Sequence, residues 1–168
     1  GMSFEDAGTI PEAGITSHAA MFTLGGLRPG WAVLVHAVGS GVGTAAVQIA
    51  RAMGGFTIGT SRTADKIERA RALGLDHGIV VGREEPRFAE EVRRLTGGRG
   101  APVVLDFVGA PYAAENLAAL APQGRVGVAR RRRDALHHRL QDLLDADALL
   151  GRRGDGLRRV RRVVVRIE

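Results

Sequence analysis

The chain has 168 residues, of which 45% are apolar and 25% charged, a composition typical of one folded domain and not of a disordered protein. It has no cysteine, which excludes a disulfide scaffold and any site with cysteine-bound zinc or iron–sulfur. Residues 1–124 carry eleven basic and twelve acidic side chains, whereas residues 125–168 carry thirteen and six, so the net charge of +6 arises wholly in the C-terminal part. No apolar run reaches the roughly 18 residues of a membrane span, and no signal peptide is recognised, so we expect a cytoplasmic protein.

Helical and apolar patterns alternate along most of the chain. Residues 4–24 form a helical stretch of small residues that we expect to be interrupted near Pro11. Short apolar runs rich in β-branched residues predict strands at 32–36, 56–60, 78–81, 103–107 and 125–128. Helical patterns lie between them at 42–53, 64–73, 85–96 and 112–120. The alternation predicts an α/β fold: a doubly wound parallel sheet of the Rossmann type, in three α/β/α layers.

The C-terminal residues continue the pattern more weakly. Asp134 is placed to cap a helix whose leucines, at 136, 140, 143 and 144, share one face, and Gly151 can end it. Val163, Val164 and Val165 can form a last strand. We therefore expect a leading helical segment at 1–30, a dinucleotide-binding core at 31–128, and an Arg-rich helix with a last strand at 129–168.

The first predicted strand runs into a glycine-rich turn and then into a helix of small residues. Glycines allow a tight turn and let backbone N–H groups approach a pyrophosphate, while the helix N-terminus supplies about half a positive charge at the same point. An ordinary strand–helix turn with incidental glycines is the alternative. We assign cofactor binding to Val38, Gly39, Ser40, Gly41, Val42 and Gly43.

The end of the second predicted strand indicates which dinucleotide is bound. Folds that bind NAD place an Asp or Glu here, about 20 residues after the glycine turn, on the ribose 2′-hydroxyl. This chain has no carboxylate there and offers Ser61, Arg62 and Lys66, which can donate to a 2′-phosphate. NADPH is therefore favoured over NADH, by at least about tenfold for one or two charge-assisted hydrogen bonds. The alternative is that Arg62 and Lys66 are solvated residues at a helix start.

The turn after the fourth predicted strand should lie under the nicotinamide half of the cofactor, because ligands bind outside the carboxyl ends of such strands. This places Val108 and Gly109 at the cofactor. A role for Asp106 in the reaction is one reading, but we expect it to hold the loop backbone together, and we expect His36 and His18 to be packing or hydrogen-bonding residues in preference to catalysts. No catalytic residue and no metal ligand is assigned, since no suitable constellation follows from the spacing.

Several spaced motifs together resemble the medium-chain dehydrogenase/reductase superfamily, over about residues 3–128. They are Gly26–Gly30, Val33–Ala37, Ser40–Gln48, Lys66–His77, Thr96–Gly100, Val103–Asp106 and Leu117–Arg125. The branch they resemble contains the zinc-independent quinone oxidoreductases and polyketide enoyl reductases. The resemblance implies hydride transfer from NADPH to a quinone or an activated C=C bond, a homodimer, and no metal. The chain departs from the family at Pro102, in its relaxed glycine pattern, and at Val80–Gly82, where the family has Asn-Tyr with the Tyr near the adenine.

The resemblance covers only a cofactor-binding domain, and the family's barrel-like substrate domain has no counterpart in this sequence. We therefore expect the chain alone to be weakly active or inactive, with the quinone or enoyl substrate recognised by a domain absent here. A non-catalytic NADP(H)-binding or dimerisation module is one alternative. A less favoured one is a nucleic-acid-binding protein that uses Arg130–Arg133 and Arg158–Arg162, since the tail lacks interleaved aromatic residues.

Overall fold

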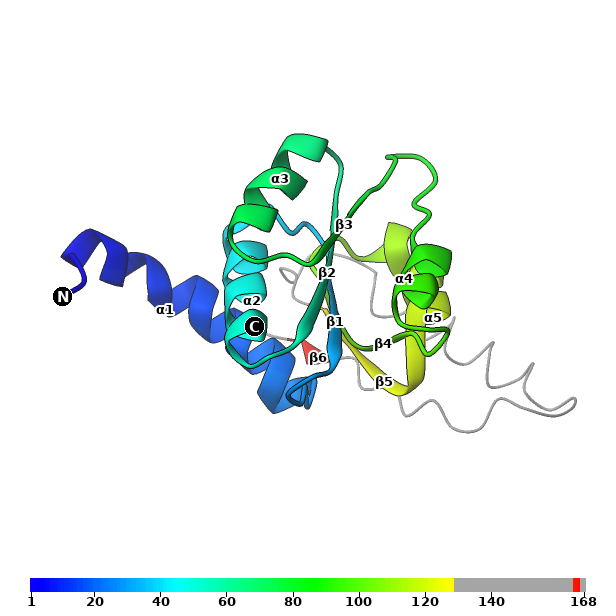
Figure 1. Cartoon of the computed structure of the whole chain (residues 1–168), viewed down its shortest axis with the longest axis horizontal. Coiled ribbons are helices and arrows are strands. Elements are labelled where there is room, and N and C mark those ends of the chain that lie inside the picture. Colours follow the sequence, from blue (N-terminus) through cyan, green and yellow to red (C-terminus); the bar gives the residue numbers. More distant parts are fainter. Residues whose placement is uncertain (129–164, 167–168) are drawn as a thin grey trace, which may run out of the picture.

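The computed structural model describes residues 1–128 and 165–166, and its centre is one parallel sheet (Figure 1). Neighbouring strands follow the order β3-β2-β1-β4-β5-β6, and all of these neighbours pair in parallel. This order reverses direction between β1 and β4, as in a doubly wound fold, so the expected fold class is confirmed. The strands are β1 Ala32–Val35, β2 Phe56–Ser61, β3 His77–Val80, β4 Ala101–Asp106, β5 Leu120–Val128 and β6 Val165–Arg166.

Alternate residues of the central strands face two separate apolar cores. In β1, Val33 and Val35 join the core with Val47 of one helical layer, while Leu34 joins the core with Phe88 of the other. The three β1 residues and Val47 are completely buried. Burial on both faces explains why the strand sequences read as continuous apolar runs instead of alternating with polar residues.

Helices cover both faces of the sheet and complete three layers (Figure 1). The helices are α1 Phe4–His18, a π-helical turn η1 Ala19–Leu24, α2 Gly41–Ala52, α3 Ala64–Ala72, α4 Ala89–Leu95, a 3₁₀ turn η2 Ala110–Tyr112 and α5 Ala113–Ala119. Residues of η1, α2 and α3 enter one core, and residues of α4, η2 and α5 enter the other.

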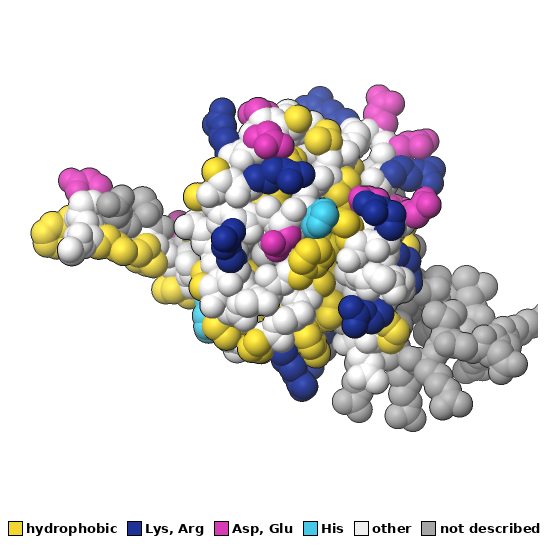
Figure 2. Space-filling model, viewed as in Figure 1, with side chains coloured by type: hydrophobic (Ala, Val, Ile, Leu, Met, Phe, Trp, Pro, Cys, Tyr) yellow, Lys and Arg dark blue, Asp and Glu magenta, His cyan; other side chains and the backbone are white. Residues whose placement is uncertain are grey.

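The first helix differs from the expectation, because α1 continues through Pro11. A proline inside a helix removes one hydrogen bond, but the turns on either side keep theirs. The first half of α1 extends from the body of the domain, and Figure 2 shows hydrophobic side chains along it. Phe4 is 96% exposed and Ile15 67%. The C-terminal end of α1 is held to the glycine turn region, where the Ser17 hydroxyl donates to the Val42 carbonyl over 2.8 Å.

Two other elements begin at a different residue than expected, because contacts with residues distant in the sequence set where they start. The helix expected at 85–96 starts only at Ala89, because the Glu115 carboxylate accepts from the N–H groups of Phe88 and Ala89, at 2.7 and 2.8 Å, and so caps it. Strand β5 starts at Leu120 and not at Arg125, since Leu120 pairs with Ala101 of β4. The register then shifts across Pro102, which has no N–H to donate to a neighbouring strand.

At the C-terminus, Val165 and Arg166 of β6 pair with Gly127 and Val128 of β5. This supports part of the last strand expected at Val163–Val165. The expected helix that starts after Asp134, and the remaining strand residues, lie outside the described residues. Within residues 1–128, no helix has the length and apolar character needed to cross a bilayer.

Candidate functional site

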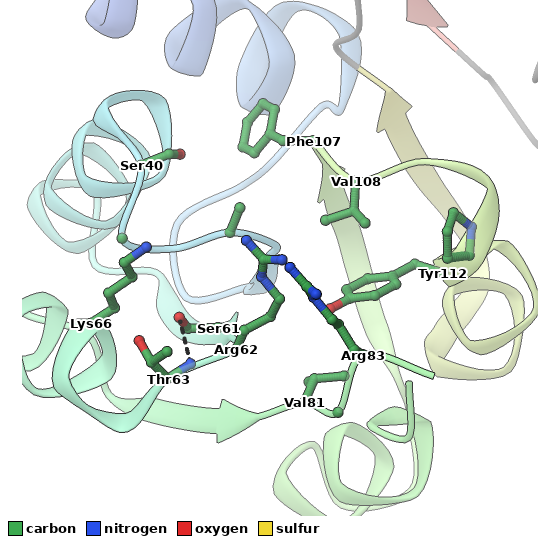
Figure 3. Close-up of a pocket in the computed structure, with 14 residues that line it drawn as sticks. Ser40, Ser61, Arg62, Thr63, Lys66, Val81, Arg83, Phe107, Val108 and Tyr112 are labelled. Carbon is green, nitrogen blue, oxygen red and sulfur yellow. Dashed lines mark hydrogen bonds between the residues drawn. The ribbon is translucent and has the colours of Figure 1, made fainter. Parts of the chain in front are cut away.

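A cavity of about 830 Å³ lies at the carboxyl ends of the strands, at the edge of the sheet where a doubly wound fold binds its ligand. It is lined by segments that follow four different strands: the turn after β1, the loop that begins α3 after β2, the loop after β3 and the turn after β4. Figure 3 shows side chains from all four segments pointing toward this space. The lining residues are Ala37, Gly39, Ser40, Ser61, Arg62, Thr63, Lys66, Val81, Gly82, Arg83, Phe107, Val108, Pro111 and Tyr112.

The glycine turn after β1 presents the start of α2 to the cavity. The Ser40 hydroxyl caps α2 by accepting from the Gly43 N–H at 3.1 Å. Gly41 and Val42 are the first two helical positions, whose N–H groups have no carbonyl acceptor within the helix. These donors and the positive end of the helix dipole make the turn suited to an anionic group.

Two glycines of the turn have different reasons to be glycine. A Cβ at Gly43 would lie 2.6 Å from the Ala37 carbonyl oxygen and 2.8 Å from the Val38 Cα, so the helix approaches the turn too closely for any side chain. A Cβ at Gly41 would meet nothing within 4 Å. Packing inside the protein therefore requires Gly43 but leaves the space beside Gly41 open.

The structure separates the residues assigned to the cofactor from sequence into those that line the cavity and those that do not. Six of them line the cavity: Gly39, Ser40, Ser61, Arg62, Lys66 and Val108. Val38, Gly43 and Gly109 are buried just beneath it, and Gly41 and Val42 form the first turn of α2. Their assignment to a cofactor stays a prediction.

Cationic side chains gather in the cavity without acidic partners. Arg62, Lys66 and Arg83 line it, no Asp or Glu does, and none of the three forms an ion pair with a carboxylate of the described residues. The stem of Lys66 crosses the glycine turn, since a Cβ at Gly39 would lie 2.9 Å from the Lys66 Cβ. The cavity is therefore electropositive and suited to a ligand with several negative charges.

A buried hydrogen-bond chain supports the cavity from below. Asp106 accepts with Oδ1 from the N–H groups of Val108 and Gly109, at 2.7 and 2.8 Å, so its expected role of holding the loop is confirmed. Its Oδ2 accepts from the Asn116 amide at 3.0 Å. Because the carboxylate can only accept, the Asn116 carbonyl faces His36 and accepts from Nε2 at 2.6 Å, while the Thr60 hydroxyl donates to Nδ1 at 2.8 Å.

Burial favours the neutral form of His36. Burial lowers the pKa of His36, while the charge of Asp106 and the hydrogen bond with Asn116 act in the opposite direction. Both ring nitrogens of the neutral ring have a partner, so the expectation of a hydrogen-bonding histidine at this position is confirmed. His18, the second histidine considered from the sequence, lies with its ring centroid 5.0 Å from that of Phe22.

Sequence reasoning missed part of the cavity wall. Tyr112 packs edge-on against His36, with ring centroids 4.8 Å apart, and borders the cavity with Val81 and Pro111. Burial raises the pKa of Tyr112, and the charge of Arg62 opposes that rise. Arg83 was also missed. The available signal was the position of 81–83 directly after a strand expected in the same parallel sheet, which brings that loop to the same edge.

The side chains of the described residues do not fit a metal ion. No three His, Asp or Glu residues among them gather in a way that could hold one, and the whole chain lacks cysteine.

The sequence of the chain matches a known protein family and similar proteins. The family model described as zinc-binding dehydrogenase matches residues 41–133, which is more than half of the chain. Erythronolide synthase EryA2 of Saccharopolyspora erythraea is 42% identical over 124 residues, which are 74% of this chain and 3% of that protein. The chain is thus similar to a small part of a very long polypeptide.

Solved structures of similar proteins share the fold. The CurK enoyl reductase superposes with a TM-score of 0.73 at 33% identity, covering 84% of this chain and 42% of the other. Mycobacterial Rv1454c complexed with NADPH gives a TM-score of 0.71 at 27% identity, covering 90% of this chain and 55% of the other. The chain therefore spans about half the length of these structures.

Proposed function

Since the chain belongs to the zinc-binding dehydrogenase family, within the medium-chain dehydrogenase/reductase superfamily, we propose that it is the NADPH-binding part of an oxidoreductase that reduces an activated C=C bond. The observation that carries this proposal is the cavity itself. An N-terminal helix turn and three cations without acidic partners converge there, at the ligand-binding edge of a doubly wound sheet. A dinucleotide with a pyrophosphate and a 2′-phosphate has the charge that this cavity complements.

In this proposal each part of the cavity binds a different part of the cofactor. The turn 39–42 binds the pyrophosphate through backbone N–H groups and the start of α2. Ser61, Arg62 and Lys66 bind the 2′-phosphate, and the loop with Val108 supports the nicotinamide half. NADPH, when bound, supplies the hydride, and the chain contributes binding, orientation and exclusion of water.

NADPH is preferred over NADH in this proposal because the lining residues near β2 donate hydrogen bonds and carry positive charge. A carboxylate there would repel a 2′-phosphate, and no lining residue has one. The similar mycobacterial structure was solved with NADPH, which supports the same choice.

A carbon–carbon double bond is the proposed hydride acceptor because CurK, whose structure is similar, is an enoyl reductase. A quinone is the other acceptor implied by the sequence resemblance. Mixing the chain with NADPH and either an enoyl thioester or a quinone distinguishes them, since NADPH oxidation with one acceptor alone identifies the reaction. Oxidation with neither, alongside tight binding, agrees with the expectation that this chain alone is weakly active or inactive.

Titration calorimetry with NADPH and NADH tests the core of the proposal. We expect NADPH to bind at least about tenfold more tightly than NADH, the preference that one charge-assisted hydrogen bond provides. No binding of either cofactor at millimolar concentration contradicts the proposal. Equal binding of both contradicts only the assignment of the 2′-phosphate.

Two partner predictions remain. A homodimer is expected from the resemblance, and light scattering of the purified chain measures it directly. Nucleic-acid binding through the Arg-rich residues concerns a segment outside the described residues. A gel shift at low and at moderate salt tests it, because phosphate contacts by arginine weaken steeply with salt.

A further inference from the structure

Arg83 reaches the cavity from a different strand than the residues assigned to the 2′-phosphate. It follows β3, whereas Ser61, Arg62 and Lys66 follow β2. Because β2 and β3 are neighbours in the sheet, their following loops meet at one edge. Arg83 is exposed, and no hydrogen bond or ion pair holds its guanidinium to any of the described residues. Its side chain is therefore available to a ligand in the cavity.

The surroundings of Arg83 differ from those of Lys66. In Figure 3, Arg62 and Arg83 point toward the same part of the cavity, beside the Tyr112 hydroxyl, while Lys66 and Ser61 lie on the other side of Arg62. Val81, Tyr112 and Pro111 line the part near Arg83. One end of the cavity thus combines a helix start with an ammonium and a hydroxyl, the other combines the Arg83 guanidinium with apolar and aromatic surface, and Arg62 lies between them.

The wall between Val81 and Arg83 is open because Gly82 contributes no side chain. A Cβ at Gly82 would meet only the Glu85 carbonyl oxygen, at 3.6 Å, so no neighbouring group fills that space. The backbone at Gly82 therefore leaves the space beside Arg83 open.

We propose that Arg83 binds the adenine ring of the cofactor by laying its guanidinium plane against the face of the base. This inference rests on the proposed function, since it presumes a dinucleotide in the cavity. An aromatic base presents a negative π-face, and arginine stacks on such faces both as a cation and as a plane. The adenine is common to NADPH and NADH, so Arg83 contributes equally to both, whereas Arg62 and Lys66 distinguish between them.

Affinity measurements on the full chain test this assignment with two substitutions at one position. Arg83→Ala removes the guanidinium, and Arg83→Lys keeps the charge but removes the plane. Arg87→Ala serves as the matched control, because Arg87 lies in the same loop, is exposed, and pairs with Glu85 outside the cavity. Thermal unfolding of each variant confirms that it is folded, which is expected because the side chain of Arg83 is exposed.

We expect Arg83→Ala and Arg83→Lys to weaken NADPH and NADH by the same factor, about threefold to tenfold, and Arg87→Ala to bind both as the unchanged chain does. Unchanged affinity in Arg83→Ala overturns the inference while the proposed function stands. Loss confined to NADPH makes Arg83 a 2′-phosphate contact and also overturns it, as does full affinity in Arg83→Lys. If the unchanged chain binds neither cofactor, the proposed function fails and this inference fails with it.

Discussion

His36 and Asn116 are joined by a buried hydrogen bond of 2.6 Å between Nε2 and Oδ1, which ties the end of β1 to α5 beneath the cavity. The bond links residues that lie 80 positions apart in the sequence. Through Asn116 it continues to Asp106, and through Asp106 to the backbone of the loop at 108–109. The chain of hydrogen bonds begins at Thr60 of β2, which bonds to His36 Nδ1. It thus runs from one neighbour of β1 to the loop after the other neighbour, β4, and positions that loop at the cavity.

Replacing Asn116 with leucine should strongly destabilise the protein. Asn116 is 2% exposed, and the substitution leaves His36 Nε2 and Asp106 Oδ2 buried without a partner. We expect the free energy of unfolding to fall by about 2–4 kcal/mol, measured by urea denaturation. Gln48→Ala, on an exposed part of α2, is the control and should change it by less than about 0.5 kcal/mol. A loss in Asn116→Leu no larger than the control would contradict the role of this chain of bonds.

Acid should weaken the fold through His36. Burial lowers the pKa of the folded-state imidazole below the unfolded value near 6.5, so the unfolded state takes up a proton first as the pH falls. The free energy of unfolding should then decrease below about pH 6.5, by at most about 1.4 kcal/mol per pH unit, and level off below the folded-state pKa.

Comparison with a variant isolates this effect. His36→Gln does not titrate, so urea unfolding of both proteins between pH 5 and 7.5 removes the contribution of the other histidines and of the carboxylates. Below pH 6.5 the unchanged protein should lose stability relative to His36→Gln. Parallel curves would show that His36 does not titrate differently in the two states.

Adding one methyl group at Gly43 should disturb the glycine turn. The Cβ would overlap the Ala37 carbonyl and the Val38 backbone, so Gly43→Ala forces α2 away from the turn, and we expect a loss of about 1–3 kcal/mol in unfolding free energy. Gly41→Ala is the matched control, two residues away with nothing near its Cβ, and it should leave the stability unchanged or slightly higher. Equal losses in the two variants would mean that the turn is sensitive to any substitution.

Removing the charge of Lys66 while keeping its stem should reduce the preference for NADPH. Lys66→Met retains the aliphatic contact with Gly39 but cannot donate to a 2′-phosphate. We expect NADPH binding to weaken about tenfold in calorimetric titration and NADH binding to stay unchanged. Arg69→Met, on the exposed face of the same helix and paired with Asp65, is the control. A matching loss of NADH affinity would place Lys66 at the pyrophosphate instead.

Local sequence patterns determined the order of the elements and much of the site. Continuous apolar runs in strands such as 32–35 are a direct consequence of burial on both faces, and the glycines mark turns that the backbone can make without a side chain. The residues Ser61, Arg62 and Lys66 could be grouped from sequence because one strand end and the first turn of one helix carry them all. The chemistry of that group follows from residue type alone.

Only the tertiary structure decided the contacts between segments that are distant in the chain. Arg83 and Tyr112 reach the cavity because the order of the parallel strands brings four loops to one edge. The residue pattern of one loop does not indicate which other loops lie beside it. The same reason explains why Glu115, 26 positions away, sets the start of α4 at Ala89. A hydrogen bond between distant segments depends on the assembled sheet, whereas a strand, a turn or a helix depends mainly on the residues within it.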